Sequence, residues 1–220
     1  MIKRILRSVF LRLWNLVYQD IRISQEIIID EYLQKNLYGH PHYSDPKRLA
    51  HFERQIYSQN GEDGIIEEIF KRIGTTNKHF VECGVGDGAE NNTAYLLLKG
   101  WKGQWIEGDP KLVAQIKHSH ADLIKGGRLS ITREFITAES VETLFANARL
   151  PQEFDLLSID IDGNDFWIWK AISQYHPRVV VIEYNAIFPP SIPWVMRYNP
   201  THMWQGGSHF GASLRSLTEL

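Results

Sequence analysis

The chain has 220 residues, of which 43% are hydrophobic and 12% aromatic, enough for one packed domain with an appendage. Its formal net charge of −2 argues against a general nucleic-acid binder, because such proteins are normally clearly basic. A single cysteine, no cleavable signal pattern and no apolar run of about 20 residues favour a cytoplasmic protein without a membrane-spanning helix.

The first 46 residues are predicted to be an amphipathic helical extension followed by a linker. In residues 2–17, apolar side chains recur on one helical face and basic side chains lie opposite. Through Arg22, five basic residues stand against one acidic residue, a net charge of +4. Such a helix can lie on an anionic surface such as the inner membrane, or it can dock on its own domain or on a second copy in a dimer. Residues 1–37 are therefore candidates for peripheral membrane contact or dimerisation.

From residue 47 onward, predicted strands and helices alternate. A helix is expected at 62–72, strands at 78–83, 104–107, 129–136, 154–161 and 178–184, and helices between the strands near 89–99, 110–119, 139–148 and 164–174. This order predicts a Rossmann-like α/β fold, with a doubly wound, mostly parallel sheet and helices on both faces. Ligands of such sheets gather beyond the carboxyl ends of the strands, so each strand end is a candidate site.

The end of the first strand carries a glycine-rich loop, Phe80 to Gly88, that is typical of a nucleotide site. Gly84, Gly86 and Ala89 also fit the dinucleotide pattern G-x-G-x-x-A, which leaves an NAD(P)-dependent oxidoreductase open. Glu82 favours another ligand, because a buried negative charge gives no advantage to a pyrophosphate but suits an ammonium and a sulfonium. S-adenosylmethionine (SAM) carries both and has no phosphate. The helix after the loop is expected to point its first amide groups at this ligand.

The next two strand ends offer contacts for the rest of a nucleoside. Glu107 ends the second strand, where a carboxylate can accept hydrogen bonds from both ribose hydroxyls. Asp109 directly precedes Pro110 and is predicted to cap a helix instead. After the third strand, residues 134–137 are placed to flank an adenine.

The fourth strand end concentrates carboxylates where an acceptor should meet the cofactor. Asp160 and Asp162 are expected on one side of the strand, because side chains alternate, whereas Asp165 is predicted to be structural. The fifth strand ends near Glu183 and Asn185. Asp160, Glu183 and Asn185 are therefore predicted ligands of a divalent cation such as Mg²⁺ or Mn²⁺. Without a metal, mutual repulsion would leave Asp160 or Asp162 as a general base.

Residues 186–210 are rich in aromatic residues and proline, and they are expected to cover the cofactor cleft. Aromatic faces suit sugar rings or planar acceptors. His209 is a candidate catalytic base in this segment, and His202 is a weaker one.

Taken together, these blocks resemble a bacterial branch of the FkbM-type class I SAM-dependent methyltransferases. The resemblance spans residues 56–217 and is carried by residues 58–64, 82–88, 105–108, 157–165 and 181–185. It implies a seven-stranded Rossmann-like sheet, SAM as methyl donor and O-methylation, often of sugars in glycans or natural products. It further implies that the methionine end of SAM contacts Glu82, Gly84 and Gly86, that the ribose contacts Glu107, and that Gln59 and Asp63 contribute to the same pocket.

The chain departs from the family pattern at its end. Residues 211–217 resemble the helix that precedes an antiparallel strand pair, but the sequence stops at Leu220. We therefore expect a methyltransferase domain at 47–220 without that pair, which leaves the fifth strand as an open edge. The sequence predicts a SAM-dependent O-methyltransferase acting on a sugar hydroxyl of a glycan or glycan precursor. The alternative is a non-catalytic SAM-fold module used for assembly or membrane attachment.

Overall fold

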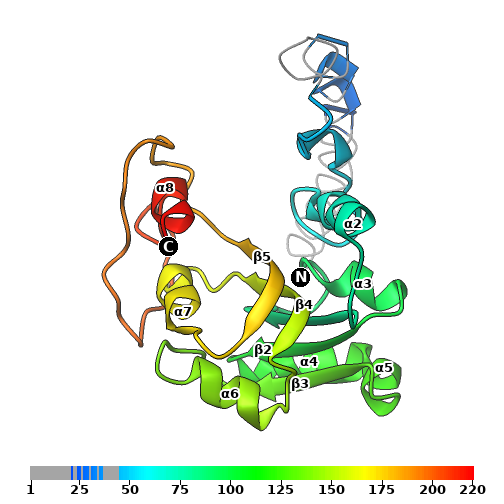
Figure 1. Cartoon of the computed structure of the whole chain (residues 1–220), viewed down its shortest axis with the longest axis vertical. Coiled ribbons are helices and arrows are strands. Elements are labelled where there is room, and N and C mark those ends of the chain that lie inside the picture. Colours follow the sequence, from blue (N-terminus) through cyan, green and yellow to red (C-terminus); the bar gives the residue numbers. More distant parts are fainter. Residues whose placement is uncertain (1–20, 22–23, 26, 30, 34, 37–44) are drawn as a thin grey trace, which may run out of the picture. The chain divides into compact units, whose positions relative to one another are not determined.

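Figure 1 shows the computed structural model, which describes residues 21, 24–25, 27–29, 31–33, 35–36 and 45–220. The chain divides into two compact units, Met1–His51 and Phe52–Leu220. The amphipathic segment 2–17 and most of the expected linker lie outside the described residues. None of the helices in the described part is both long enough and apolar enough to cross a membrane.

The second unit is built on a five-stranded parallel sheet. Its strands are β1 (His79–Cys83), β2 (Lys102–Glu107), β3 (Leu129–Arg133), β4 (Glu153–Ile159) and β5 (His176–Ile182). They lie in the order β3-β2-β1-β4-β5, and every neighbouring pair is parallel. The chain leaves β1 in one direction to build β2 and β3 and then returns to β4 on the other side. The carboxyl ends of β1 and β4 are therefore the switch point at which such sheets bind ligands.

Helices cover both faces of this sheet, which confirms the predicted fold class (Figure 1). The described helices are η2 (Ala50–Phe52), α2 (Glu62–Ile73), α3 (Ala94–Leu98), α4 (Pro110–Ser119), α5 (Ala121–Lys125), α6 (Val141–Asn147), α7 (Asp165–Ala171) and α8 (Leu214–Thr218). Side chains of α2, α3 and α4 pack in one apolar core, and those of α6 and α7 pack in the other. Both cores are needed because a parallel sheet is apolar on both sides.

Alternation along the strands divides the apolar side chains between the two cores. On β1, Phe80 enters the α2–α3–α4 core and Val81 the α6–α7 core, and both are fully buried. Gly103 lies opposite Phe80 on β2, and a Cβ atom there would come within 2.0 Å of the phenyl ring. The absence of a side chain at Gly103 therefore lets the ring lie across the neighbouring strand.

The amino-terminal edge of the sheet is held by one buried carboxylate, Asp155 on β4. Its oxygens accept hydrogen bonds from the Thr76 amide at 3.0 and 2.9 Å, from the Lys78 amide at 2.8 Å and from Arg178 at 2.8 Å. Burial raises the pKa of this carboxyl, but the hydrogen bonds from Arg178, Thr76 and Lys78 outweigh that effect and lower it below the usual value. Asp155 thus joins β4, β5 and the turn before β1.

Several predicted boundaries differ from the structure. Helix α3 begins at Ala94, five residues after the expected start, because polar side chains capture the preceding amides. Helix α5 was not predicted, and β3 ends at Arg133. The resemblance implied seven strands, whereas the described residues form five and add only an isolated antiparallel bridge between Val195 and Ala212.

Candidate functional site

The candidate site lies at the carboxyl ends of the strands. Three glycines lie there, and the structural reason for glycine differs between the three positions. Gly84 has φ of +80°, and a Cβ atom there would lie 1.6 Å from the backbone oxygen of Asp160. Gly86 has φ of +63°, but its Cβ direction meets no atom within 4 Å. Gly88, at +78°, packs near the Trp105 ring. Gly84 therefore serves the joining of β1 to β4, and only Gly86 leaves free space that a ligand could enter.

Glu82 is almost fully buried at the end of β1, as expected, and its carboxylate faces the loop before α3. One oxygen accepts from the Asn92 amide at 2.9 Å, and the other accepts from the Thr93 hydroxyl at 2.5 Å. Burial raises the pKa of Glu82 to about 7, although both hydrogen bonds favour the ionised form. A cation near this carboxylate would offset that cost of burial.

Glu107 is buried at the end of β2 and lies directly beside the glycine loop. Its Oε2 accepts from the amides of Val85 at 3.2 Å and Gly86 at 2.9 Å, and its Oε1 accepts from the Asp109 amide at 2.9 Å. A carboxylate offers about four acceptor positions, so Glu107 can accept one further hydroxyl without releasing the loop. The predicted cap is confirmed at the same turn, because Asp109 accepts from Lys111 at 2.6 Å.

Several amide groups of this region are already bound by the protein. Asn91 Oδ1 accepts from the Ala94 amide at 2.8 Å and from the Thr93 amide at 3.3 Å, so the start of α3 is capped. Together with the Val85 and Gly86 amides held by Glu107, these contacts use several of the donors that a pyrophosphate-binding loop presents to its ligand. The sequence predicted that the first amides of the helix face the ligand, whereas the Thr93 and Ala94 amides bind Asn91 instead.

The turn before α2 forms another wall near the site. Asp63 is buried, and its Oδ2 accepts from the amides of Ile56, Tyr57 and Ser58 at 2.8, 2.6 and 2.8 Å. These contacts fix the turn, so they give Asp63 a structural role that the sequence did not suggest. Gln59 is exposed on the same turn.

Three carboxylates meet where β4 and β5 end. Asp160, Asp162 and Glu183 can each place an oxygen within 4.8 Å of the other two. Burial, with repulsion from Asp162 and Glu62, raises the pKa of Asp160 to about 6. Burial, with repulsion from all three nearby aspartates, raises the pKa of Glu183 to about 8. Among the described residues, no cation forms a salt bridge with this cluster.

Two neighbouring polar residues are structural. Asp165 accepts from the amides of Ile161 and Gly163, each at 2.9 Å, as predicted for a residue that shapes the turn. Asn185 was a predicted metal ligand, but its Oδ1 accepts from the Ile187 amide at 3.1 Å. Its Nδ2 donates to the carbonyls of Ser208 at 2.8 Å and Phe210 at 3.0 Å. The Asn185 side chain thus binds the segment after β5, while Asp162 lies with Asp160 and Glu183 in the cluster.

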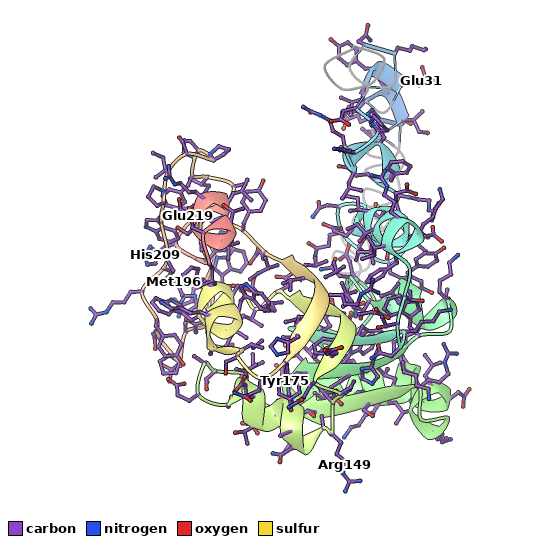
Figure 2. The ribbon with its side chains drawn as sticks, viewed as in Figure 1. Glu31, Arg149, Tyr175, Met196, His209 and Glu219 are labelled. Atoms are coloured by element: carbon purple, nitrogen blue, oxygen red, sulfur yellow. The ribbon has the colours of Figure 1, made fainter. Side chains whose placement is uncertain are left out.

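The long segment between β5 and α8 runs past α7 (Figure 1) and is tied to the turn after β4. Asn164 Nδ2 donates to the Asn199 carbonyl at 2.8 Å, and the Gly211 amide donates to the Gly163 carbonyl at 3.1 Å. Trp167 donates to the carbonyl of Met196 at 2.8 Å, and Figure 2 shows Met196 beside α7. The segment is thus held against α7 and the turn after β4, and we call it the cover.

The two candidate histidines lie in different places on this segment. His202 packs on the turn after β4, because a Cβ atom on Gly163 would lie 2.4 Å from its ring. His209 is exposed at the margin of the segment (Figure 2), and its ring lies edge-on to Trp194 at 5.4 Å. His209 makes no hydrogen bond to a described residue. His209 thus makes no hydrogen bond to the carboxylates among the described residues, and its role as a catalytic base stays a prediction.

Sequence reasoning missed the polar layer between the glycine loop and α3. Asn92 donates from its side chain to Ser158 on β4 at 3.1 Å, and Thr93 accepts from the Trp105 indole at 2.8 Å. The run Asn91 to Thr93 consists of residues that favour helix caps, and this signal could have placed the start of α3 correctly. Phe135, after β3, lies over Gly108, where a Cβ atom would meet the phenyl ring at 2.2 Å.

No family model and no curated protein matches the chain. Among solved structures, it is similar to the S-adenosylhomocysteine-bound methyltransferase PaMTH1 of Podospora anserina, at 15% identity and a TM-score of 0.45, over 73% of this chain and 69% of that one. It is also similar to the precorrin-6y C5,15-methyltransferase of Geobacter metallireducens, at 14% identity and a TM-score of 0.40, over 59% of this chain and 64% of that one. A third is the Bacillus cereus O-methyltransferase in complex with S-adenosylhomocysteine, at 14% identity and a TM-score of 0.40, over 66% and 68% of the two chains. We base the function on this chain's own residues.

Proposed function

We propose that the chain is a SAM-dependent O-methyltransferase. The observation that carries this proposal is the occupation of four amides, two by Glu107 and two by Asn91, which removes donors that a phosphate could bind. A carboxylate beside the loop also repels a phosphate. The adenosyl ligand that suits such a pocket is positively charged and has no phosphate, which disfavours the NAD(P)-dependent alternative.

The residues around the glycine loop fit this cofactor. Gly86 borders free space, and Glu107 retains an acceptor position for a ribose hydroxyl. Glu82, whose pKa is raised by burial, would gain from a nearby ammonium or sulfonium. When bound, SAM would supply an electrophilic methyl group. We infer from the five sequence blocks that the chain belongs to the FkbM-like branch.

Asp160 and its neighbours are the proposed acceptor end of the site. A carboxyl whose pKa is raised to about 6 is mostly ionised at neutral pH and can still take a proton from an acceptor hydroxyl. Exposed aromatic side chains near this end, Tyr184 and Trp204, offer faces to a sugar ring. The proposed acceptor is therefore a sugar hydroxyl of a glycan or glycan precursor.

A divalent cation is a second way in which this cluster could act. Asp160, Asp162 and Glu183 offer the oxygen ligands that Mg²⁺ and Mn²⁺ prefer, and their mutual repulsion would be relieved by a bound cation. We propose this cation as an accessory of the same reaction. If it takes part, chelation with EDTA should abolish methyl transfer and added Mg²⁺ should restore it, whereas EDTA-resistant transfer would show that the carboxylates act without a cation.

Titration calorimetry with the full chain tests the cofactor. We expect S-adenosylhomocysteine to bind and NADPH not to bind. Glu107→Ala should weaken the binding of S-adenosylhomocysteine at least about tenfold, because a buried acceptor of several hydrogen bonds is lost. Glu153→Ala is the matched control, since Glu153 is an exposed acid at the start of β4, at the opposite ends of the strands. Binding of NADPH without binding of S-adenosylhomocysteine would overturn the proposal.

Transfer of a labelled methyl group from SAM to extracted glycans tests the acceptor. A gain of one methylene mass on a sugar, lost in Asp160→Asn, is the expected result. Cofactor binding without transfer to any acceptor would instead support the non-catalytic module.

A further inference from the structure

Asn91 has a buried donor that the protein leaves unused. The residue is 7% exposed, and its Nδ2 has no hydrogen-bond partner among the residues that the structure describes. A buried polar group without a partner destabilises the fold, so native proteins rarely keep one without a reason. Asn91 lies between the glycine loop and α3, within the proposed cofactor site.

The other half of the same amide explains how Asn91 is oriented. Its Oδ1 accepts from the amides of Ala94 at 2.8 Å and Thr93 at 3.3 Å, and this assigns oxygen and nitrogen without ambiguity. Because the amide is planar, Nδ2 then faces away from the amides that Oδ1 caps. The cap holds the side chain in place, so its nitrogen is a preorganised donor.

Neighbouring acceptors bind other donors, and none of them accepts from Asn91 Nδ2. Both oxygens of Glu82 accept hydrogen bonds from Asn92 and Thr93. The Ser158 hydroxyl accepts from the Asn92 side chain. These contacts place Asn92 and Thr93, which directly follow Asn91, at the carboxyl ends of β1 and β4, the switch point of the sheet.

We propose that Asn91 Nδ2 donates to the carboxylate of the amino-acid portion of the cofactor. This inference rests on the proposed function. An adenosyl ligand with a methionine-derived end brings one anionic group, and its oxygens are strong acceptors for a neutral amide donor. The nearby carboxylates, Glu82 and Asp160, would repel that anion unless a donor such as Asn91 compensates.

Two ligands that differ only at this end provide the test. S-adenosylhomocysteine has the amino-acid carboxylate, whereas 5′-methylthioadenosine has the adenosine and sulfur without it. Asn91→Asp keeps the helix cap but replaces the donor by a negative charge, and Asn91→Ser keeps a capping oxygen and removes the amide. For both variants we expect at least about tenfold weaker binding of S-adenosylhomocysteine and unchanged binding of 5′-methylthioadenosine in calorimetry with the full chain.

Each result decides between specific outcomes. Equal losses for both ligands, or wild-type affinity of Asn91→Ser for S-adenosylhomocysteine, would overturn the role of Asn91 while the proposed function stands. If the wild-type chain binds neither ligand, the proposed function fails and this inference fails with it. Thermal unfolding of each variant shows that a loss restricted to one ligand is not a loss of folded protein.

Discussion

At the scale of single residues, the glycine loop combines strict packing with free space. Gly84 is held between β1 and the backbone of Asp160, whereas Gly86 has a left-handed conformation but open surroundings. The glycine loop was interpreted as one ligand-binding unit, but its glycines have separate roles, one in packing and one in leaving space for a ligand. Glu82 has an electrostatic role, because it is a buried acid at the same strand end.

Alanine substitutions should distinguish the packing role of Gly84 from the ligand-binding role of Gly86. Gly84→Ala should reduce the free energy of unfolding by at least about 3 kcal/mol, because strain at positive φ adds to a clash with backbone. Gly86→Ala should cost only about 1–2 kcal/mol in stability, since its Cβ meets nothing, yet it should weaken S-adenosylhomocysteine binding. Urea unfolding and calorimetry measure both effects. Equal stabilities of the two variants would contradict the roles assigned to Gly84 and Gly86.

The protonation of Glu82 should be visible in stability. Its pKa is about 7 in the fold, against an ordinary value of 4.5, so the folded state holds a proton that the unfolded state has lost between these pH values. The stability contributed by Glu82 is fully present below pH 4.5 and is lost as the pH rises through 7. Relative to the wild type, Glu82→Gln should therefore gain roughly 2–3 kcal/mol between pH 5 and pH 8.

The comparison between the two proteins isolates Glu82, because His79 and His120, whose pKa values burial lowers, contribute equally to both. Urea unfolding at several pH values gives the measurement. Glu90→Gln, at an exposed acid of the same loop, is the control and should run parallel to the wild type. A Glu82→Gln curve parallel to the wild type would show that Glu82 stays ionised throughout.

At the scale of elements, the cover between β5 and α8 depends on a few polar contacts with the turn after β4. Asn164 is 6% exposed and bonds to Asn199 through both ends of its amide, at 2.8 and 3.4 Å. Contacts of this kind fix the cover without a strand or helix of its own. Local opening of the cover should therefore depend on Asn164 more than global unfolding does.

Hydrogen exchange can test the contact between Asn164 and Asn199. In Asn164→Ala, the loss of about 1–2 kcal/mol should accelerate amide exchange in residues 195–203 by roughly 5- to 30-fold, while exchange in β1 and β4 remains slow. Thr201→Ala is the control, because Thr201 is exposed and bonds only to the neighbouring Asn199. Uniform acceleration across the sheet would mean that Asn164 supports the whole domain instead of the cover.

At the scale of the whole molecule, the parallel sheet with helices on both faces followed from local sequence patterns. Each of the five strands was predicted because short apolar runs and amphipathic helical patterns alternate along the chain. The start of α3 was not, because Glu82 binds the Asn92 amide from ten residues away and delays the helix. Contacts over long sequence separations decide such boundaries.

The candidate site was predicted less completely for the same reason. Asp160 and Glu183 were expected together because parallel strands end at one edge, and they are close in the structure. Asp162 joins them through a turn with φ of +56°, not through strand alternation, because β4 ends at Ile159. Asn185 was misassigned because its partners, Ser208 and Phe210, lie more than twenty residues further along the chain.

We expect the amino-terminal ends of the strands to contribute to stability and the carboxyl ends to ligand binding. A substitution of Asp155 tests this expectation. It lies at the amino-terminal edge, fully buried, with Arg178 and the turn before β1 as partners. Asp155→Asn removes the charge that these donors face and should lower the free energy of unfolding by about 3 kcal/mol or more, because Arg178 loses its anionic partner. Removing a carboxylate whose pKa is lowered in the fold should matter most above the unfolded pKa and vanish as the pH falls through the folded pKa.

At a temperature where the variant remains folded, its affinity for S-adenosylhomocysteine should equal that of the wild type, because the candidate site lies at the opposite ends of the strands. Chemical unfolding at pH 7 and calorimetry on the same samples measure the two quantities together. If Asp155→Asn binds the ligand more weakly while it is fully folded, the two edges are coupled through the strands. The stability of the sheet and the shape of the glycine loop would then depend on one another.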